Sequence, residues 1–181
     1  LSDGHVELQR SIKKLQANGV FLSLVSKNNS QDVEDLFIQR KDYPLDWEDF
    51  SAIEVSWGSK ADAIAKIEKK LRISADSILF LDDNPGELLH VRGRHPTVHT
   101  LHAHDDAFLT DSALRYFPGL WRWNINNDDL KRVHDLKAND DRDLLANAAE
   151  SLDDYFEALE VNITIRQDPI DQLKRLADLC A

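Results

Sequence analysis

The stretch SILFLDDNPGE, residues 77–87, holds the clearest structural signal in the chain. Its apolar first half predicts a short buried strand, and the strand ends at two adjacent carboxylates, Asp82 and Asp83. Asn84 can cap a following helix, and Pro85 suits the first helical position. The stretch therefore predicts a strand-to-helix junction with paired acids at the carboxyl end of the strand.

Strand and helix patterns alternate on both sides of this junction, with short links between them. This alternation predicts an α/β fold with a parallel sheet and helices on its faces. We expect this domain to end near the turn at 118–119. The expected helices are 6–15, a helix from 30 or 31, 59–71 and 85–93, and the expected strands are 20–25, 52–55, 78–81 and 98–101.

The chain divides into three parts by composition. Residues 1–118 form the α/β domain, residues 119–160 read as an acidic helical linker, and residues 161–181 read as the start of another domain. The chain contains no methionine, and it stops inside a helical pattern. We therefore expect a fragment of a longer polypeptide.

Composition restricts the classes of function. With 181 residues, 42% hydrophobic and 30% charged, the chain suits a soluble globular protein. Its net charge of −11 disfavours nucleic acid as a partner. No apolar run is long enough for a membrane span or a secretory signal, so no membrane partner is expected. The single cysteine, Cys180, excludes an internal disulfide, and the cytoplasm is the expected compartment.

The paired acids suggest a metal site. In parallel α/β sheets, ligands bind beyond the carboxyl ends of the strands. Two hard carboxylates at such a place suit Mg²⁺, which takes few protein ligands and keeps its waters for a phosphate. Taken alone, Asp82 and Asp83 fit an ordinary aspartate-rich turn equally well. Glu87 stands at the third helical position, where a capping box would place it.

Two other strand-to-helix junctions carry residues suited to phosphate. Ser26 ends the strand 20–25, and a hydroxyl with the loop amides of Lys27 and Asn28 can hold phosphate oxygens. Lys60 follows the capping residue Ser59, so its cation faces the positive end of the helix dipole and needs an anion nearby. Taken alone, a polar loop and a solvated surface lysine are the simpler explanations.

Together the three junctions describe one kind of chemistry. A hydroxyl and a lysine on the phosphate, with acids on a metal, make a phosphoryl-transfer site. The receiver domains of two-component signalling use similar residues, but their acid pair comes first along the chain. Here it comes last, which argues against a receiver domain.

Other features favour structural roles. The histidines in HTLHAH do not match a zinc-binding spacing, the acidic run 140–143 lacks the glycine of a calcium loop, and the cysteine has no obvious base beside it. The tryptophan pair suits a packing seam between two units. These residues are His99, His102, His104, Asp140, Asp141, Asp143, Cys180, Trp121 and Trp123.

The order serine, lysine, aspartate pair resembles the haloacid dehalogenase (HAD) superfamily. The segments LVSKNN, DFSAIEVSWGSKADAI and ILFLDDNPGE together resemble its FkbH-like branch, of the HAD-IIIC type. The resemblance extends from residue 1 to about residue 118 and continues more loosely afterwards. It implies a Rossmann-like three-layer sandwich, followed from residue 161 by the start of an acetyltransferase-like (GNAT-like) domain.

The resemblance implies a role for each matching residue. Ser26 would bind the phosphoryl group, Lys60 would stabilise the phosphate and the nucleophile, and Asp82 and Asp83 would hold Mg²⁺. Asn28 and Asn84 would be neighbours of the site. FkbH-like proteins are linked to taking a glyceryl unit from 1,3-bisphosphoglycerate onto an acyl carrier protein, with loss of phosphate. A phosphorylated small molecule and an acyl carrier protein are thus the expected partners.

One departure from the family is serious. Its first motif, D-x-D-x-T at the end of a strand, supplies the nucleophile, and nothing here matches it. Asp3 is followed by Gly4 and His5, with no strand before it. We expect the motif just upstream of Leu1, so that residues 1–181 alone would be inactive. The alternative is a non-catalytic binding or regulatory module that keeps the fold without the nucleophile.

Overall fold

The structure is a computed structural model that describes residues 1–120, 145, 151–159 and 165. The chain forms two compact units, Leu1–Lys137 and Ala138–Ala181. In the second unit the structure describes one helix, α7, at Leu152–Ala158. Residues 161–181, where the start of another domain is predicted, lie outside the described residues apart from position 165, and so do the tryptophan pair, the acidic run 140–143 and Cys180. The domain limits at 118 and 160 stay predictions.

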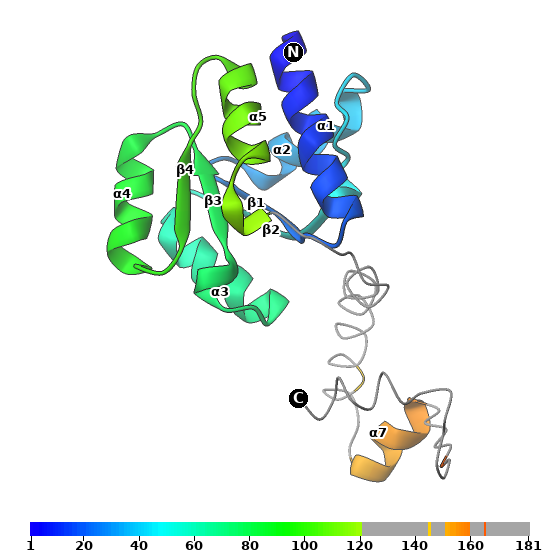
Figure 1. Ribbon diagram of the computed structural model, residues 1–181. Coiled ribbons are helices and arrows are strands. Elements are labelled where there is room, and N and C mark those ends of the chain that lie inside the picture. The colour runs from blue at the N-terminus through cyan, green and yellow to red at the C-terminus, as the bar shows by residue number, and fades with distance from the viewer. Residues whose placement is uncertain (121–144, 146–150, 160–164, 166–181) are drawn as a thin grey trace. The chain divides into compact units, whose positions relative to one another are not determined.

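Helices and strands alternate through the first unit, which confirms the predicted α/β class (Figure 1). Short 3₁₀ turns stand at Trp47–Asp49, Ala75–Ser77 and Pro118–Leu120. The main elements are α1 (Asp3–Ala17), β1 (Leu22–Ser26), α2 (Ser30–Gln39), β2 (Phe50–Val55), α3 (Lys60–Leu71), β3 (Leu79–Asp82), α4 (Pro85–Arg94), β4 (His99–His102) and α5 (Ala107–Arg115).

The four strands in the described part of the first unit form two parallel pairs. β1 pairs with β2, and Ser26 lies opposite Val55. β3 pairs with β4, and Asp82 lies opposite His102. β1 and β3 occupy the inner positions and share no backbone ladder (Figure 1). The predicted α/β class with parallel strands is confirmed.

Side chains join the two strand pairs where the backbone does not. Ala61 and Ile64 of α3 pack with Phe80 of β3, and Val25 of β1 packs against the same cluster. Val91 of α4 completes it and is fully buried. A shared apolar core under α3 and α4 therefore holds both pairs in one unit.

The helix ends explain why these elements stop and start where they do. Gly19 has a φ of 86°, and the Val20 N–H donates to the Leu15 carbonyl, which ends α1 in a left-handed turn that favours glycine. Ser59 and Asn84 cap α3 and α4 through their side chains, as the sequence predicts. Each cap lies directly after a strand, so it also fixes the loop at the strand's carboxyl end.

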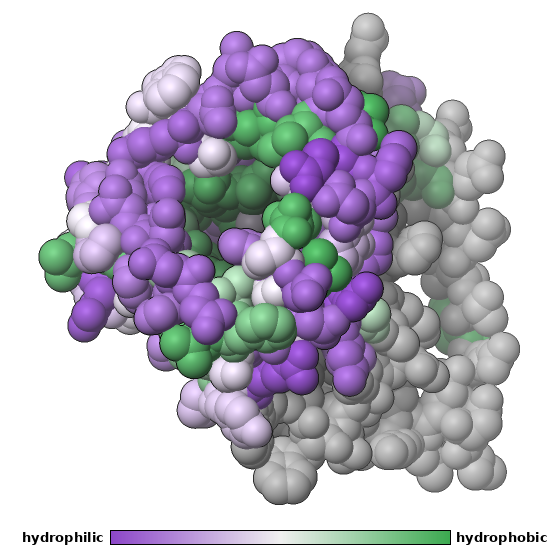
Figure 2. Space-filling model, turned by 90° about the horizontal axis from the view of Figure 1, so that it is seen from above, coloured by the Kyte–Doolittle hydropathy of each residue, from purple (hydrophilic) through white to green (hydrophobic). Residues whose placement is uncertain are grey.

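Viewed from above Figure 1, the first unit is hollowed at the carboxyl ends of its strands. Figure 2 shows hydrophobic residues in the hollow and a mostly hydrophilic rim. The unpaired inner edges of β1 and β3 run toward this face (Figure 1). Within the described part of the chain, no helix is long and apolar enough to cross a membrane.

Candidate active site

Loops from three strands bring the predicted residues to the same edge. Ser26 is the last residue of β1, and its carbonyl accepts a hydrogen bond of 3.0 Å from the N–H of Ser56, which follows β2. Lys60 begins α3 a few residues later, and Asp82 ends β3. The site is therefore built at the carboxyl ends of parallel strands, where the sequence places it.

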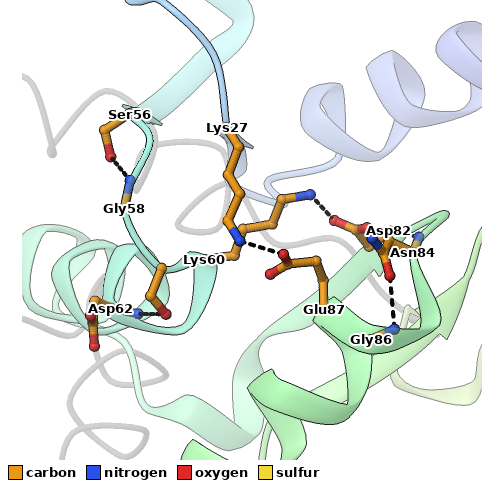
Figure 3. Close-up of polar contacts among 10 residues, drawn as sticks. Lys27, Ser56, Gly58, Lys60, Asp62, Asp82, Asn84, Gly86 and Glu87 are labelled. Carbon is orange, nitrogen blue, oxygen red and sulfur yellow. Dashed lines mark hydrogen bonds and ion pairs between the residues drawn. The ribbon is translucent and has the colours of Figure 1, made fainter.

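Lys60 and Asp82 make the central contact of this edge (Figure 3). The Lys60 ammonium lies 2.5 Å from Asp82 Oδ2, and the two side chains are only 14% and 5% exposed. Asp82 Oδ1 accepts a second hydrogen bond, 2.9 Å, from the backbone N–H of Asn84. Asp82 thus supplies the anion that a lysine at the first position of a helix requires.

A second ion pair crosses the same edge and was not foreseen. The Lys27 ammonium donates to Glu87 Oε1, joining the loop after β1 to the first turn of α4 (Figure 3). The other carboxylate oxygen of Glu87 is buried and has no hydrogen-bond partner among the described residues. Sequence reasoning assigned Glu87 to a capping box, because nothing local in the sequence points to a partner 60 positions away.

Asn28, Asn29 and Asn84 stabilise the loops at this edge through hydrogen bonds that their side-chain oxygens accept. Asn28 Oδ1 accepts from the N–H of Asn29 at 2.8 Å, and Asn29 in turn caps α2 by accepting from the N–H of Gln31 at 2.9 Å. Asn84 Oδ1 accepts from the N–H of Gly86 at 2.8 Å (Figure 3). Asn28 and Asn84 therefore stand beside the site as expected, each with its side-chain oxygen bonded to the backbone.

The acid pair fits the donor set that Mg²⁺ takes. Asp82 is buried and Asp83 is exposed, so one carboxylate is fixed and its neighbour is open to solvent. Among the described residues no group of three or more histidines, cysteines or acids is placed to hold a metal. Two carboxylates suit a magnesium ion that keeps most of its waters, and they fall short of the four-ligand zinc sites of proteins.

The histidines of HTLHAH make three separate contacts. The His99 ring packs edge-on against Phe117, with centroids 5.6 Å apart. His102 Nε2 lies 3.1 Å from the backbone carbonyl of Asp83, and His104 Nδ1 accepts from the N–H of Asp106 at 2.9 Å. His102 therefore touches the loop that carries the acid pair, a neighbour that sequence reasoning did not connect with the site.

Chemically, the edge combines two lysines with three carboxylates around a half-buried serine. Such an arrangement can hold an anionic ligand through the lysines and a divalent cation through the acids. Asp3, the first acid of the chain, lies in the first turn of α1 and does not end a strand. None of the predicted site residues corresponds to the aspartate nucleophile of the D-x-D-x-T motif.

A comparison with solved structures also indicates a phosphatase-type domain. No protein-family model matches the chain, and no curated protein matches it significantly. Among solved structures, the chain is similar to the N-terminal part of the protein BF1531 from Bacteroides fragilis, which contains a phosphatase domain and was crystallised with Mg. The sequence identity is 32% and the TM-score is 0.59. The match covers 65% of this chain and 31% of that chain, so this chain spans about a third of that relative's length.

Proposed function

We propose that the first unit is a magnesium-dependent phosphatase-type domain of the HAD superfamily, in its FkbH-like branch. The observation that carries the proposal is the buried contact of Lys60 with Asp82 at the carboxyl ends of parallel strands. A lysine and a carboxylate meet there although they lie 22 positions apart in the sequence. The similarity to the phosphatase domain of BF1531 supports the same class of chemistry.

In this proposal each residue has a separate task. The Ser26 hydroxyl and the Lys60 ammonium bind oxygens of the phosphoryl group, with the loop amides of Lys27 and Asn28 beside them. Asp82 and Asp83 hold Mg²⁺, which when bound neutralises charge on the phosphate. Since Lys60 and the metal would share Asp82, metal binding would free part of the lysine's charge for the substrate.

The proposed substrate is an acyl phosphate such as 1,3-bisphosphoglycerate, whose glyceryl group would be passed to an acyl carrier protein. The support for this finer assignment is the resemblance of the motifs around Ser26, Lys60 and Asp82 to FkbH-like proteins. The paired lysines at the edge, Lys27 and Lys60, suit a strongly anionic substrate in an otherwise acidic chain.

The proposed nucleophile is an aspartate on a strand outside residues 1–181. Two observations support this part of the proposal. Among the strands that the structure describes, β1 and β3 each pair on one side only, and both run toward the hollow in Figure 2. A parallel strand inserted between β1 and β3 would satisfy both backbone edges and end beside Ser26 and Asp82.

Two measurements test the proposal. Titration of residues 1–181 with Mg²⁺ should give binding that Asp82→Asn and Asp83→Asn weaken by more than tenfold. Asp62→Asn is the matched control, because Asp62 is an exposed acid in the first turn of α3. Absence of Mg²⁺ binding in the unsubstituted chain would overturn the metal assignment.

The second measurement uses the protein extended by its native upstream sequence. Phosphate release from acetyl phosphate should then require Mg²⁺ and should be lost in Lys60→Met. If the extended protein binds Mg²⁺ but releases no phosphate from any acyl phosphate, the alternative of a non-catalytic binding module replaces the enzyme.

A further inference from the structure

Among residues 1–120 of the first unit, Trp57 is the most exposed large hydrophobic residue, with 76% of its surface accessible. It belongs to the loop 56–59, which joins β2 to α3 at the carboxyl edge. The other exposed large hydrophobic side chains of the first unit's described residues lie on α2, α4 or α5, beside the end of α5, or at Leu1. Trp57 alone among them stands in a strand-to-helix loop, where the site residues also stand.

The backbone on both sides of Trp57 is anchored. The Ser56 N–H donates to the Ser26 carbonyl at 3.0 Å, and the Gly58 N–H donates to Ser56 Oγ at 3.3 Å (Figure 3). Ser59 then caps α3 directly before Lys60. The backbone that carries Trp57 is therefore fixed on both sides, so the exposure of the indole does not come from a long unanchored segment.

Along the chain, Trp57 stands between a residue bonded to Ser26 and Lys60, the two proposed phosphoryl ligands. Its preceding neighbour, Ser56, is hydrogen-bonded to Ser26, and Lys60 follows three positions later. A phosphate held by the Ser26 hydroxyl and the Lys60 ammonium would direct its remaining substituent away from the buried Asp82 and toward the rim. The loop 56–59 forms the rim on this side.

We propose that Trp57 is a specificity-determining residue whose indole binds the carbon portion of the phosphorylated substrate. The inference rests on the proposed function, because it takes the phosphoryl group to lie at Ser26 and Lys60. An indole face is large, apolar and negatively polarised, so it favours C–H or aromatic surfaces and disfavours a second anionic group in contact with it. The substrate class is therefore a phosphate ester or acyl phosphate in which the carbon group attached to the phosphoryl oxygen is uncharged.

The test compares inorganic phosphate with phenyl phosphate, both in the presence of Mg²⁺. Binding to residues 1–181 is followed by NMR, and the Trp57 indole N–H resonance is assigned by its absence in Trp57→Ala. Phenyl phosphate should bind about two- to tenfold more tightly than phosphate, the usual range for an aromatic contact. In Trp57→Ala the two affinities should become equal, while the affinity for phosphate stays unchanged.

Tyr116→Ala is the matched control, because Tyr116 is an equally exposed aromatic residue at 73%. It follows α5 and neighbours Phe117, whose ring contacts His99 at the start of β4, so it lies at the opposite end of the strands from the site. This variant should keep the preference for phenyl phosphate. A preference that survives in Trp57→Ala, or is absent from the unsubstituted chain while phosphate still binds, would overturn the inference and leave the proposed function intact. Failure of both ligands to bind would overturn both.

Discussion

The two strand pairs contribute opposite charges to one edge. The β1–β2 half and the helix that follows it provide Ser26, Lys27 and Lys60, whereas the β3–β4 half provides the carboxylates. Both ion pairs of the edge run from the first half to the second. Neither half has both the cations and the acids that phosphoryl transfer needs, so the site exists only when the halves are docked.

The two ion pairs also differ in burial. Lys60 and Asp82 are 14% and 5% exposed, while Lys27 and Glu87 are 39% and 14% exposed. Removing one partner of a buried ion pair leaves the other charge buried without a counter-charge. The loss of stability is smaller where solvent reaches the remaining charge. Substitutions in the Lys60–Asp82 pair should therefore lower the free energy of unfolding more than substitutions in the Lys27–Glu87 pair.

The largest effect is expected for Lys60→Met. It leaves the Asp82 carboxylate buried without its cation, which should lower the free energy of unfolding by about 3 kcal/mol in the absence of metal. Urea unfolding with and without Mg²⁺ measures it. Added Mg²⁺ should stabilise Lys60→Met more than the unsubstituted chain, because the ammonium no longer competes for Asp82.

Lys66→Met is the control for that substitution, since Lys66 is 64% exposed in its pair with the half-buried Glu54. Its cost should stay below about 1 kcal/mol. Equal losses in the two lysine variants would contradict the importance given to burial.

A smaller effect is expected for Glu87→Gln. The charge on Lys27 loses its partner but keeps access to water, so the loss should be about 1–2 kcal/mol. The affinity for Mg²⁺ should not change, because Glu87 is not among the proposed metal ligands. A double-mutant cycle with Lys27→Met should show coupling between the two positions. Additive losses would mean that the pair does not join the halves.

The two helix caps give a symmetric test of the halves. Ser59→Ala removes the cap of α3, and Asn84→Ala removes that of α4, each at an expected cost of about 1 kcal/mol. Thermal unfolding should show similar losses. Only Asn84→Ala should also weaken Mg²⁺ binding, because the lost side-chain cap to the Gly86 N–H holds the loop from which the retained Asn84 backbone N–H donates to Asp82. Weakened metal binding in Ser59→Ala alone would reverse the assignment of roles to the halves.

The smallest effect on stability is expected for the Arg40–Asp42 ion pair, which lies outside the edge that carries the site. The hydrogen bond from the Arg40 guanidinium lowers the pKa of Asp42 to about 2 from 3.8. The contribution to stability is therefore present above pH 3.8 and is lost as the pH falls through 2. NMR titration of Asp42 should show this pKa and its return toward 3.8 in Arg40→Met. Both side chains are exposed, so unfolding near neutral pH should barely respond.

The sequence predicted the elements with strong local signals. The apolar face of α3, with Ile64, Ile67 and Leu71, is buried as expected, and the residues that cap α3 and α4 are those predicted. α5 was missed because half of its buried face is polar. Thr110 and Asp111 are buried beside Ala107 and Leu114, so the helical spacing of apolar residues is not visible there.

Contacts between distant positions were only partly predictable. The meeting of Lys60 with Asp82 follows from a rule, since the carboxyl ends of parallel strands share an edge. The pairing of Lys27 with Glu87 follows from no local pattern and depends on how α4 docks beside β1. The split into two strand pairs agrees with the absence of a strand carrying the D-x-D-x-T motif, whereas an apolar strand by itself does not reveal whether one or both of its edges are paired.

The division of the strands has a consequence for the order of folding. Every strand pairing before α3 lies within residues 22–55, and every one after it lies within residues 79–102. Each pair is a complete β-helix-β segment, so the first pair can form during synthesis before the second has left the ribosome. The helix between them then closes the apolar core in a last step. We therefore expect refolding in which each pair gains protection from hydrogen exchange separately, before Lys60 meets Asp82.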